Sequence, residues 1–189
     1  MQKMCPNFLK TMLKETYEKE IIEKMIGEYG YKNALSVPRL EKIVLNVGFG
    51  KVGSDQKVID GVKSDLGKIT GQRPSLRAAK VAIASFKIRK GQTIGAKVTL
   101  RGNKMWDFVE KLIRIVLPRV RDFRGISTKS FDKNGGYTLG FREKTVFPEI
   151  DYTKGEAQSG LEVTLSTTAK TPQEAKSLLE NLGFPFREG

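Results

Sequence analysis

Three groups of residues in this sequence have types and spacings that suit chemistry. Gly48–Gly53 (GFGKVG) fits the G-x-G-x-x-G pattern, in which glycines let backbone amides approach a phosphate closely. Glu149 and Asp151 lie two residues apart, so an extended chain presents both carboxylates on one face, as paired-carboxylate catalysis needs. Residues 66–106 hold 10 Lys and Arg and no acidic residue, a pattern typical of polyanion binding.

The first two groups are weak indications of an enzyme. The glycine pattern follows an expected strand and precedes an expected helix, but no further βαβ unit follows it, so a glycine-rich turn is favoured over a dinucleotide site. A nucleotide-dependent oxidoreductase stays open as the alternative hypothesis. The two carboxylates beside Pro148 are more typical of a solvated patch or a docking site. The sequence has no His, and Cys5 is its one cysteine, which excludes a Ser-His-Asp triad, an imidazole or thiolate metal site and a disulfide framework. We therefore expect no enzyme, no cofactor and no small-molecule substrate.

The charge distribution points to an anionic partner. The 189 residues include 34 Lys and Arg against 21 Asp and Glu, a net charge of +13. Residues 66–106 supply +10 of it, whereas residues 145–189 are net −3 with 7 acidic and 4 basic side chains. Such a charge favours nucleic acid first and an anionic membrane surface second. The chain has no apolar run of about 18 residues and no basic amphipathic helix with bulky apolar anchors, so we expect a cytoplasmic protein without a membrane partner.

Hydrophobic periodicity predicts one α+β domain over residues 1–189. Apolar residues at helical spacing predict four helices, over residues 8–28, 55–69, 103–117 and from Thr171 to Gly183. Alternation predicts five strands, over residues 41–47, 85–90, 93–101, 137–142 and 161–167, with a tight hairpin turn at Gly91-Gln92. Strands paired as hairpins favour a mainly antiparallel sheet with helices packed on one face.

That layout leaves the other face of the sheet open, as in RNA-recognition folds. Because side chains alternate along a strand, the open face is expected to carry Asn46, Lys97, Thr99 and Arg101. Polar and cationic groups on such a face can bind an RNA backbone and hydrogen-bond its sugars or bases. Residues 78–95 are expected to project from the sheet as a basic loop, in which Phe86 either stacks on a base or joins the core.

Several long stretches resemble the bacterial ribosomal large-subunit protein five family, which binds 5S rRNA. They are Pro38–Gly48 (PRLEKIVLNVG), Phe86–Arg89 (FKIR) through Lys97–Gly102 (KVTLRG), Leu117–Gly125, and Phe147–Tyr152 (FPEIDY). Thr167–Lys170 and Pro185-Phe186 match as well. The resemblance begins near residue 10 and covers nearly all the rest of the chain, with residues 1–16 as an N-terminal extension.

The resemblance implies a structural protein in the central protuberance of the large ribosomal subunit, in the cytoplasm. Its implied partners are 5S rRNA, large-subunit rRNA, peptidyl-site tRNA and small-subunit protein thirteen. By motif match, 5S rRNA contacts Asn46, Gln72 and Thr99, to which the open face adds Lys97 and Arg101. The implied tRNA-contacting loop carries Arg77, Lys80, Phe86, Lys87 and Arg89. The implied intersubunit bridge carries Arg142, Phe147, Glu149 and Asp151, near the acidic end that suits a basic protein.

Overall fold

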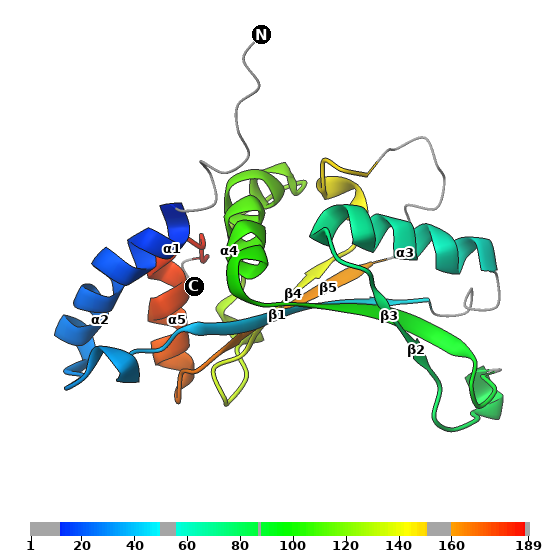
Figure 1. Ribbon diagram of the computed structural model, residues 1–189, viewed down its shortest axis with the longest axis horizontal. Coiled ribbons are helices and arrows are strands. Elements are labelled where there is room, and N and C mark those ends of the chain that lie inside the picture. Colours follow the sequence, from blue (N-terminus) through cyan, green and yellow to red (C-terminus); the bar gives the residue numbers. More distant parts are fainter. Residues whose placement is uncertain (1–11, 50–55, 87, 151–159, 188–189) are drawn as a thin grey trace, which may run out of the picture. The chain divides into compact units, whose positions relative to one another are not determined.

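The chain forms one five-stranded sheet with several helices (Figure 1). The computed structural model describes residues 12–49, 56–86, 88–150 and 160–187. The sheet has the strand order β2-β3-β1-β5-β4. Its strands are β1 (Leu40–Gly48), β2 (Ser75–Ala78), β3 (Thr93–Leu100), β4 (Tyr137–Phe141) and β5 (Leu161–Thr167). The α-helices are α1 (Met12–Thr16), α2 (Ile22–Tyr29), α3 (Gln56–Thr70), α4 (Gly102–Lys111) and α5 (Pro172–Asn181).

Backbone hydrogen bonds at the strand ends give the strand directions. The Phe49 amide, after the end of β1, donates to the carbonyl of Ile94 near the start of β3 at 3.0 Å. The Thr168 amide, after the end of β5, donates to the carbonyl of Arg39 before β1 at 2.9 Å. Strand β1 is therefore antiparallel to both neighbours, and β2 pairs antiparallel with β3. The predicted α+β class with an antiparallel sheet is confirmed.

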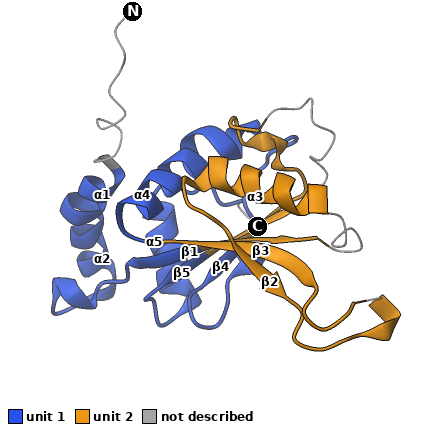
Figure 2. Ribbon diagram, turned by 45° about the vertical axis from the view of Figure 1, so that its right-hand side comes forward, with its two compact units in different colours: residues 1–43, 101–138, 165–189 blue, residues 44–100, 139–164 orange. Residues whose placement is uncertain are grey.

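Two compact units divide the chain, and their boundary falls within strands β1, β4 and β5 (Figure 2). Unit 1 comprises residues 1–43, 101–138 and 165–189, and unit 2 comprises residues 44–100 and 139–164. Unit 1 thus contains helices α1, α2, α4 and α5, whereas unit 2 contains α3 with β2 and β3.

Unit 2 has a core between one helix and one face of its strands. Helix α3 repeats apolar residues at helical spacing, and its inner stripe is at most 6% exposed: Ile59, Val62, Leu66 and Ile69. Every second residue of the strands is buried as well, among them Leu45, Val47, Val98, Leu100 and Val163. Each such side chain stabilises the fold by roughly 1.5–3 kcal/mol relative to exposure. This burial fixes which strand face is left for polar residues.

Unit 1 contains a helix that changes its winding. Residues 17–21 form a π-helical turn between α1 and α2. Apolar residues here recur every four positions, which would drift by about 40° per step around a regular α-helix. The wider π turn reduces that drift, so Tyr17, Ile21 and Met25 are all buried. The Tyr17 ring lies 5.4 Å from that of Trp106 in α4, and its hydroxyl donates to the Pro38 carbonyl at 3.0 Å.

The predicted strand over residues 85–90 is wrong. Residues 84–86 form a 3-10 turn, and the hairpin partner of β3 is β2, which was not among the predicted strands. All four β2 residues are exposed, so no alternation of apolar and polar residues marks it. The apolar residues that imitated a strand are themselves at the surface, Phe86 being 68% exposed.

The remaining predicted elements are confirmed within a few residues, apart from residues 8–11 and 55, which lie outside the described part of the chain. The third helix continues past Lys111 as a π turn over Leu112–Val116 and a 3-10 turn over Leu117–Arg119, so it ends after Pro118 rather than before it. Thr171 caps α5 by accepting the Glu174 amide at 3.3 Å. The Glu174 carboxylate accepts the amide of Lys170 at 3.0 Å. The return bond of the capping box therefore goes to the residue before the N-cap and not to Thr171 itself.

Gly95 is needed where β3 lies against β1. A Cβ built on Gly95 would lie 2.9 Å from the Val47 carbonyl oxygen, a backbone atom that cannot move freely. We expect Gly95→Ala to lower the free energy of unfolding by about 1–3 kcal/mol, the usual cost of overpacking. Gly140→Ala in β4 is the control, because its Cβ would meet nothing within 4 Å. Urea denaturation of both variants measures the difference, and equal midpoints would contradict the close approach.

Candidate nucleic-acid interface

The open face of unit 2 brings together three of the predicted RNA-binding residues. Asn46 of β1 is exposed, and Lys97 and Thr99 of β3 are half-buried between buried neighbours, so all three point away from α3. Ser75 pairs with Lys97 across the β2–β3 ladder, and therefore lies on the same face. The face thus presents an amide, an ammonium and two hydroxyl groups, which can hydrogen-bond RNA phosphates, 2′-hydroxyls and base edges.

An acidic side chain from outside the basic residues 66–106 shares this face. The Asn46 amide nitrogen donates to the carboxylate of Glu162 on β5 at 3.3 Å. This bond uses the donor end of the amide and leaves its oxygen as an acceptor for a base amino group or a 2′-hydroxyl. The open face therefore carries an acid beside the polar and cationic residues that the sequence predicts. Alternation on β5 already places Glu162 opposite buried Val163, but only the β1–β5 pairing brings it beside Asn46.

Arg101, the fifth predicted contact, belongs to unit 1 and has an acidic partner there. Its guanidinium lies 3.5 Å from the Glu41 carboxylate, which also accepts the Ser166 hydroxyl at 3.3 Å. The positive charge of Lys42 and the hydrogen bonds from Ser166 and Arg101 hold the pKa of Glu41 below its ordinary value. Glu41 is therefore ionised at neutral pH. An RNA phosphate would have to compete with this carboxylate for the guanidinium, although such exposed pairs are weak.

Gln72 is held at the surface by the turn that ends α3. Gly71 adopts a left-handed conformation with φ of 61°, and its amide donates to the Gly67 carbonyl at 2.8 Å. The Gln72 amide donates to the Thr70 hydroxyl at 3.3 Å, and this hydroxyl lies 2.6 Å from the Leu66 carbonyl oxygen. The turn satisfies backbone groups of the Gln72 segment and leaves its side chain exposed.

Residues 79–92 form a loop that leaves the sheet between β2 and β3. The Ala79 amide donates to the Gln92 carbonyl at 2.8 Å, which closes its base. Further out, Ile83 and Ile88 exchange two backbone hydrogen bonds of 3.0 and 3.1 Å. The predicted loop residues Lys80, Phe86 and Arg89 are exposed here, and Arg77 is exposed on β2. Lys87 lies outside the described residues. Cations beside apolar side chains that face solvent suit a partner with both phosphates and flat bases.

The residues predicted for the intersubunit bridge differ in exposure. Arg142 is exposed and Glu149 is half-buried. Phe147 is fully buried, with its ring 5.8 Å from that of Phe141, so it packs in unit 2 and presents no surface to a partner. Asp151 lies outside the described residues, so its pairing with Glu149 is not described either.

A buried ion pair anchors the chain that leads to these residues. Lys144 has no exposed side-chain surface, and its ammonium lies 3.2 Å from the Asp65 carboxylate of α3. Burying an ammonium without a counter-charge is costly, so the pair ties residues 144–146 to the helix. No local sequence pattern indicates this pair, because the two residues are 79 positions apart.

The glycine pattern does not have the surroundings of a dinucleotide site. Strand β1 ends at Gly48, and residues 50–55 lie outside the described part of the chain. A dinucleotide fingerprint needs a parallel βαβ unit, whereas the next strand after α3 is β2, which pairs with β3 and not with β1. Within the described ranges, no group of three or more acidic or cysteine side chains suits a metal ion.

Comparisons with known proteins decide the family. The family model for ribosomal protein L5 matches residues 33–89, and the model for the C-terminus of the same ribosomal family matches residues 93–186. Together they span most of the chain. The chain belongs to the ribosomal protein L5 family. The large ribosomal subunit protein uL5 of Carboxydothermus hydrogenoformans is 53% identical over 174 residues, which cover 92% of this chain and 97% of the relative. The uL5 of Symbiobacterium thermophilum is 53% identical, with coverage of 93% and 98%.

Membership of the L5 family confirms the coarse functional expectation. The chain is a structural constituent of the large ribosomal subunit in the cytoplasm, where it binds rRNA, and it is not an enzyme. The family assignment therefore overrides the oxidoreductase alternative. Among the described helices, none is long and apolar enough to cross a membrane.

Proposed function

We propose that this L5-family chain attaches 5S rRNA in the central protuberance through the open face of its sheet. The observation that supports this most is the grouping of Asn46, Lys97 and Thr99 on one polar face, opposite the face that α3 covers. The three residues come from two strands, and none of them is needed for the core. Gln72 adds an exposed amide from the turn after α3. Arg101, which belongs to unit 1, is included in the proposal by the sequence alone.

The charged residues and the uncharged polar residues have different roles in the proposed binding. Lys97 and Arg101 supply long-range attraction for the phosphate backbone, which fixes position but carries no sequence information. Asn46, Gln72 and Thr99 supply directional hydrogen bonds, which distinguish the RNA that fits. Glu162 orients the amide of Asn46, so that its oxygen points in a defined direction before the RNA arrives.

Replacement of Asn46 or Thr99 by Ala tests the polar contacts. Each variant should bind 5S rRNA about fivefold more weakly, the loss of one hydrogen bond worth about 1 kcal/mol. The thermal midpoint should change little, because neither side chain is buried. Ser130→Ala, an exposed hydroxyl on another segment, is the control. Filter binding measures all three affinities, and wild-type affinity of both test variants would remove these residues from the site.

We also propose that the loop of residues 79–92 contacts peptidyl-site tRNA. This proposed contact is supported by the exposure of Phe86, at 68%, and Val81, at 69%, beside the cations Lys80 and Arg89. An aromatic ring that no core contact requires can stack on a base or a terminal base pair, while the cations contact phosphates. Lys87 is included in this proposal by the sequence alone.

Replacement of Phe86 separates stacking from simple hydrophobic contact. In ribosomes that carry Phe86→Leu, peptidyl-site tRNA should dissociate about 5–30 times faster, which corresponds to stacking worth about 1–2 kcal/mol. Phe86→Trp should retain the wild-type rate, because it keeps an aromatic face. Nitrocellulose retention of labelled tRNA measures the rate, and equal rates for Leu, Trp and wild type would exclude stacking.

We propose further that residues from Arg142 to Asp151 contact small-subunit protein thirteen in an intersubunit bridge. The exposed Arg142, the Lys144–Asp65 anchor and the acidic balance of residues 145–189 support this. Because Phe147 is buried, its role would be to hold the segment in shape rather than to touch the partner.

Replacement of Arg142 tests the bridge. Ribosomes with Arg142→Ala should need a higher magnesium concentration to join their subunits than wild-type ribosomes, because one exposed contact of the bridge is lost. Lys129→Ala, another exposed cation, should behave like wild type. Sucrose-gradient profiles over a magnesium series measure the joined fraction, and matching profiles for all three would contradict a contact at Arg142.

A further inference from the structure

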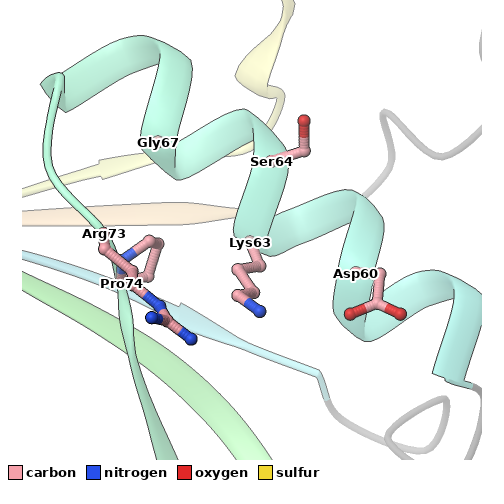
Figure 3. Close-up of a pocket in the computed structure, with 6 residues that line it drawn as sticks. All are labelled: Asp60, Lys63, Ser64, Gly67, Arg73 and Pro74. Carbon is pink, nitrogen blue, oxygen red and sulfur yellow. The ribbon is translucent and has the colours of Figure 1, made fainter.

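A cationic cleft lies on helix α3, which covers the opposite side of unit 2 from the open face. It has a volume of about 420 Å³ and is lined by Asp60, Lys63, Ser64, Gly67, Arg73 and Pro74. Figure 3 shows the side chains of Lys63 and Arg73 on the same side of the helix, directed into the space beneath it. Lys63 comes from the helix itself, and Arg73 from the connection to β2.

The two cations of the cleft have no partner within the described part of the chain. Neither forms an ion pair or a hydrogen bond through its side chain there. The one carboxylate in the cleft, that of Asp60, accepts the Gln56 amide at 3.3 Å and pairs with neither cation. Two cations against one carboxylate leave the cleft net positive, so the site favours an anion.

Gly67, in the same cleft, is a second feature that favours a ligand from outside the protein. It lies inside α3, where glycine is the least favourable residue apart from proline. A Cβ at this position would meet nothing within 4 Å, so no packing inside the protein requires glycine. The missing side chain keeps the helix backbone open to close approach from outside, beside the two cations.

We propose that this cleft binds a phosphate of an RNA backbone, with Lys63 and Arg73 as its ligands. A strand that tracks a protein surface brings phosphates and not bases to a helix of this kind, which explains two cations and the absence of an exposed aromatic residue among the lining residues. The occupant is rRNA of the large subunit, which members of this family bind. The phosphate belongs to 5S rRNA or to the longer large-subunit rRNA, and the experiment distinguishes them.

The proposal is independent of the contacts on the open face. The cleft residues come from α3 and its connection to β2, which also carries Gln72, whereas Asn46 and Thr99 face away from α3. If the Ala variants at these two positions left 5S rRNA binding unchanged, the proposed open-face site would fail and the cleft would stand or fall by its own measurement.

Salt dependence of binding tests the cleft. Each phosphate contact contributes about 0.7–0.9 to the slope of log affinity against log salt. For Lys63→Gln with Arg73→Gln, the slope for purified 5S rRNA or for the purified longer rRNA should fall by about 0.7–0.9, the contribution of the one phosphate that the two side chains bind together. The control double variant, Lys68→Gln with Lys32→Gln, removes the same charge from exposed lysines outside the cleft, and should retain the wild-type slope.

A steric variant adds a readout that net charge does not affect. Gly67→Gln places an uncharged side chain at the cleft and meets no internal clash, so it should fold normally and weaken binding of the same rRNA. Circular dichroism and thermal melts establish folding of every variant. Slopes that are unchanged for both RNAs, or that fall equally in the control, would overturn the proposal. Unchanged RNA binding with loss of a protein from reconstituted subunits would overturn it too, since the partner would then be an acidic protein segment.

Discussion

The alternation of side chains along the inner strands is the constraint on which the rest of unit 2 depends. Leu45, Val47, Val98 and Leu100 are at most 2% exposed because α3 covers their face. A shift of one residue in either strand would turn these side chains to solvent and bring Asn46, Lys97 or Thr99 into the core. The packing that stabilises the unit therefore also fixes which residues lie on the open face. Gly95 belongs to the same constraint, since β3 lies too close to the Val47 carbonyl for any side chain.

The surface that results is less uniformly positive than the sequence of residues 66–106 implies. Glu162 reaches Asn46, and Glu41 reaches Arg101, from strands that lie elsewhere in the sequence. Each acid reduces the positive charge of the surface and also contacts a polar group that the sequence predicts to bind RNA. The Glu162 bond occupies the donor end of the Asn46 amide, whereas the exposed Glu41–Arg101 pair is weak.

The parts of the sequence with strong periodicity were predictable, and those without it were not. Helix α3 and strands β1, β3 and β5 repeat apolar residues at clear intervals, since each has one buried face. Strand β2 has no buried residue, and it forms only because its backbone pairs with β3. Residues 85–90 imitate a strand because Phe86 and Ile88 alternate with polar residues, yet this pattern belongs to a projecting loop.

The sequence by itself determined the charge, the exclusion of imidazole and disulfide chemistry, the helices and strands with periodic cores, and the family resemblance. These depend on residue types and on spacings of a few positions, which the chain carries locally. Only the tertiary structure decided which acids lie beside Asn46 and Arg101, that Lys144 is buried against Asp65, and that Lys63, Gly67 and Arg73 share a cleft. Such neighbours are set by strand order and helix packing, because contacts between distant residues follow from the burial of the whole sheet face.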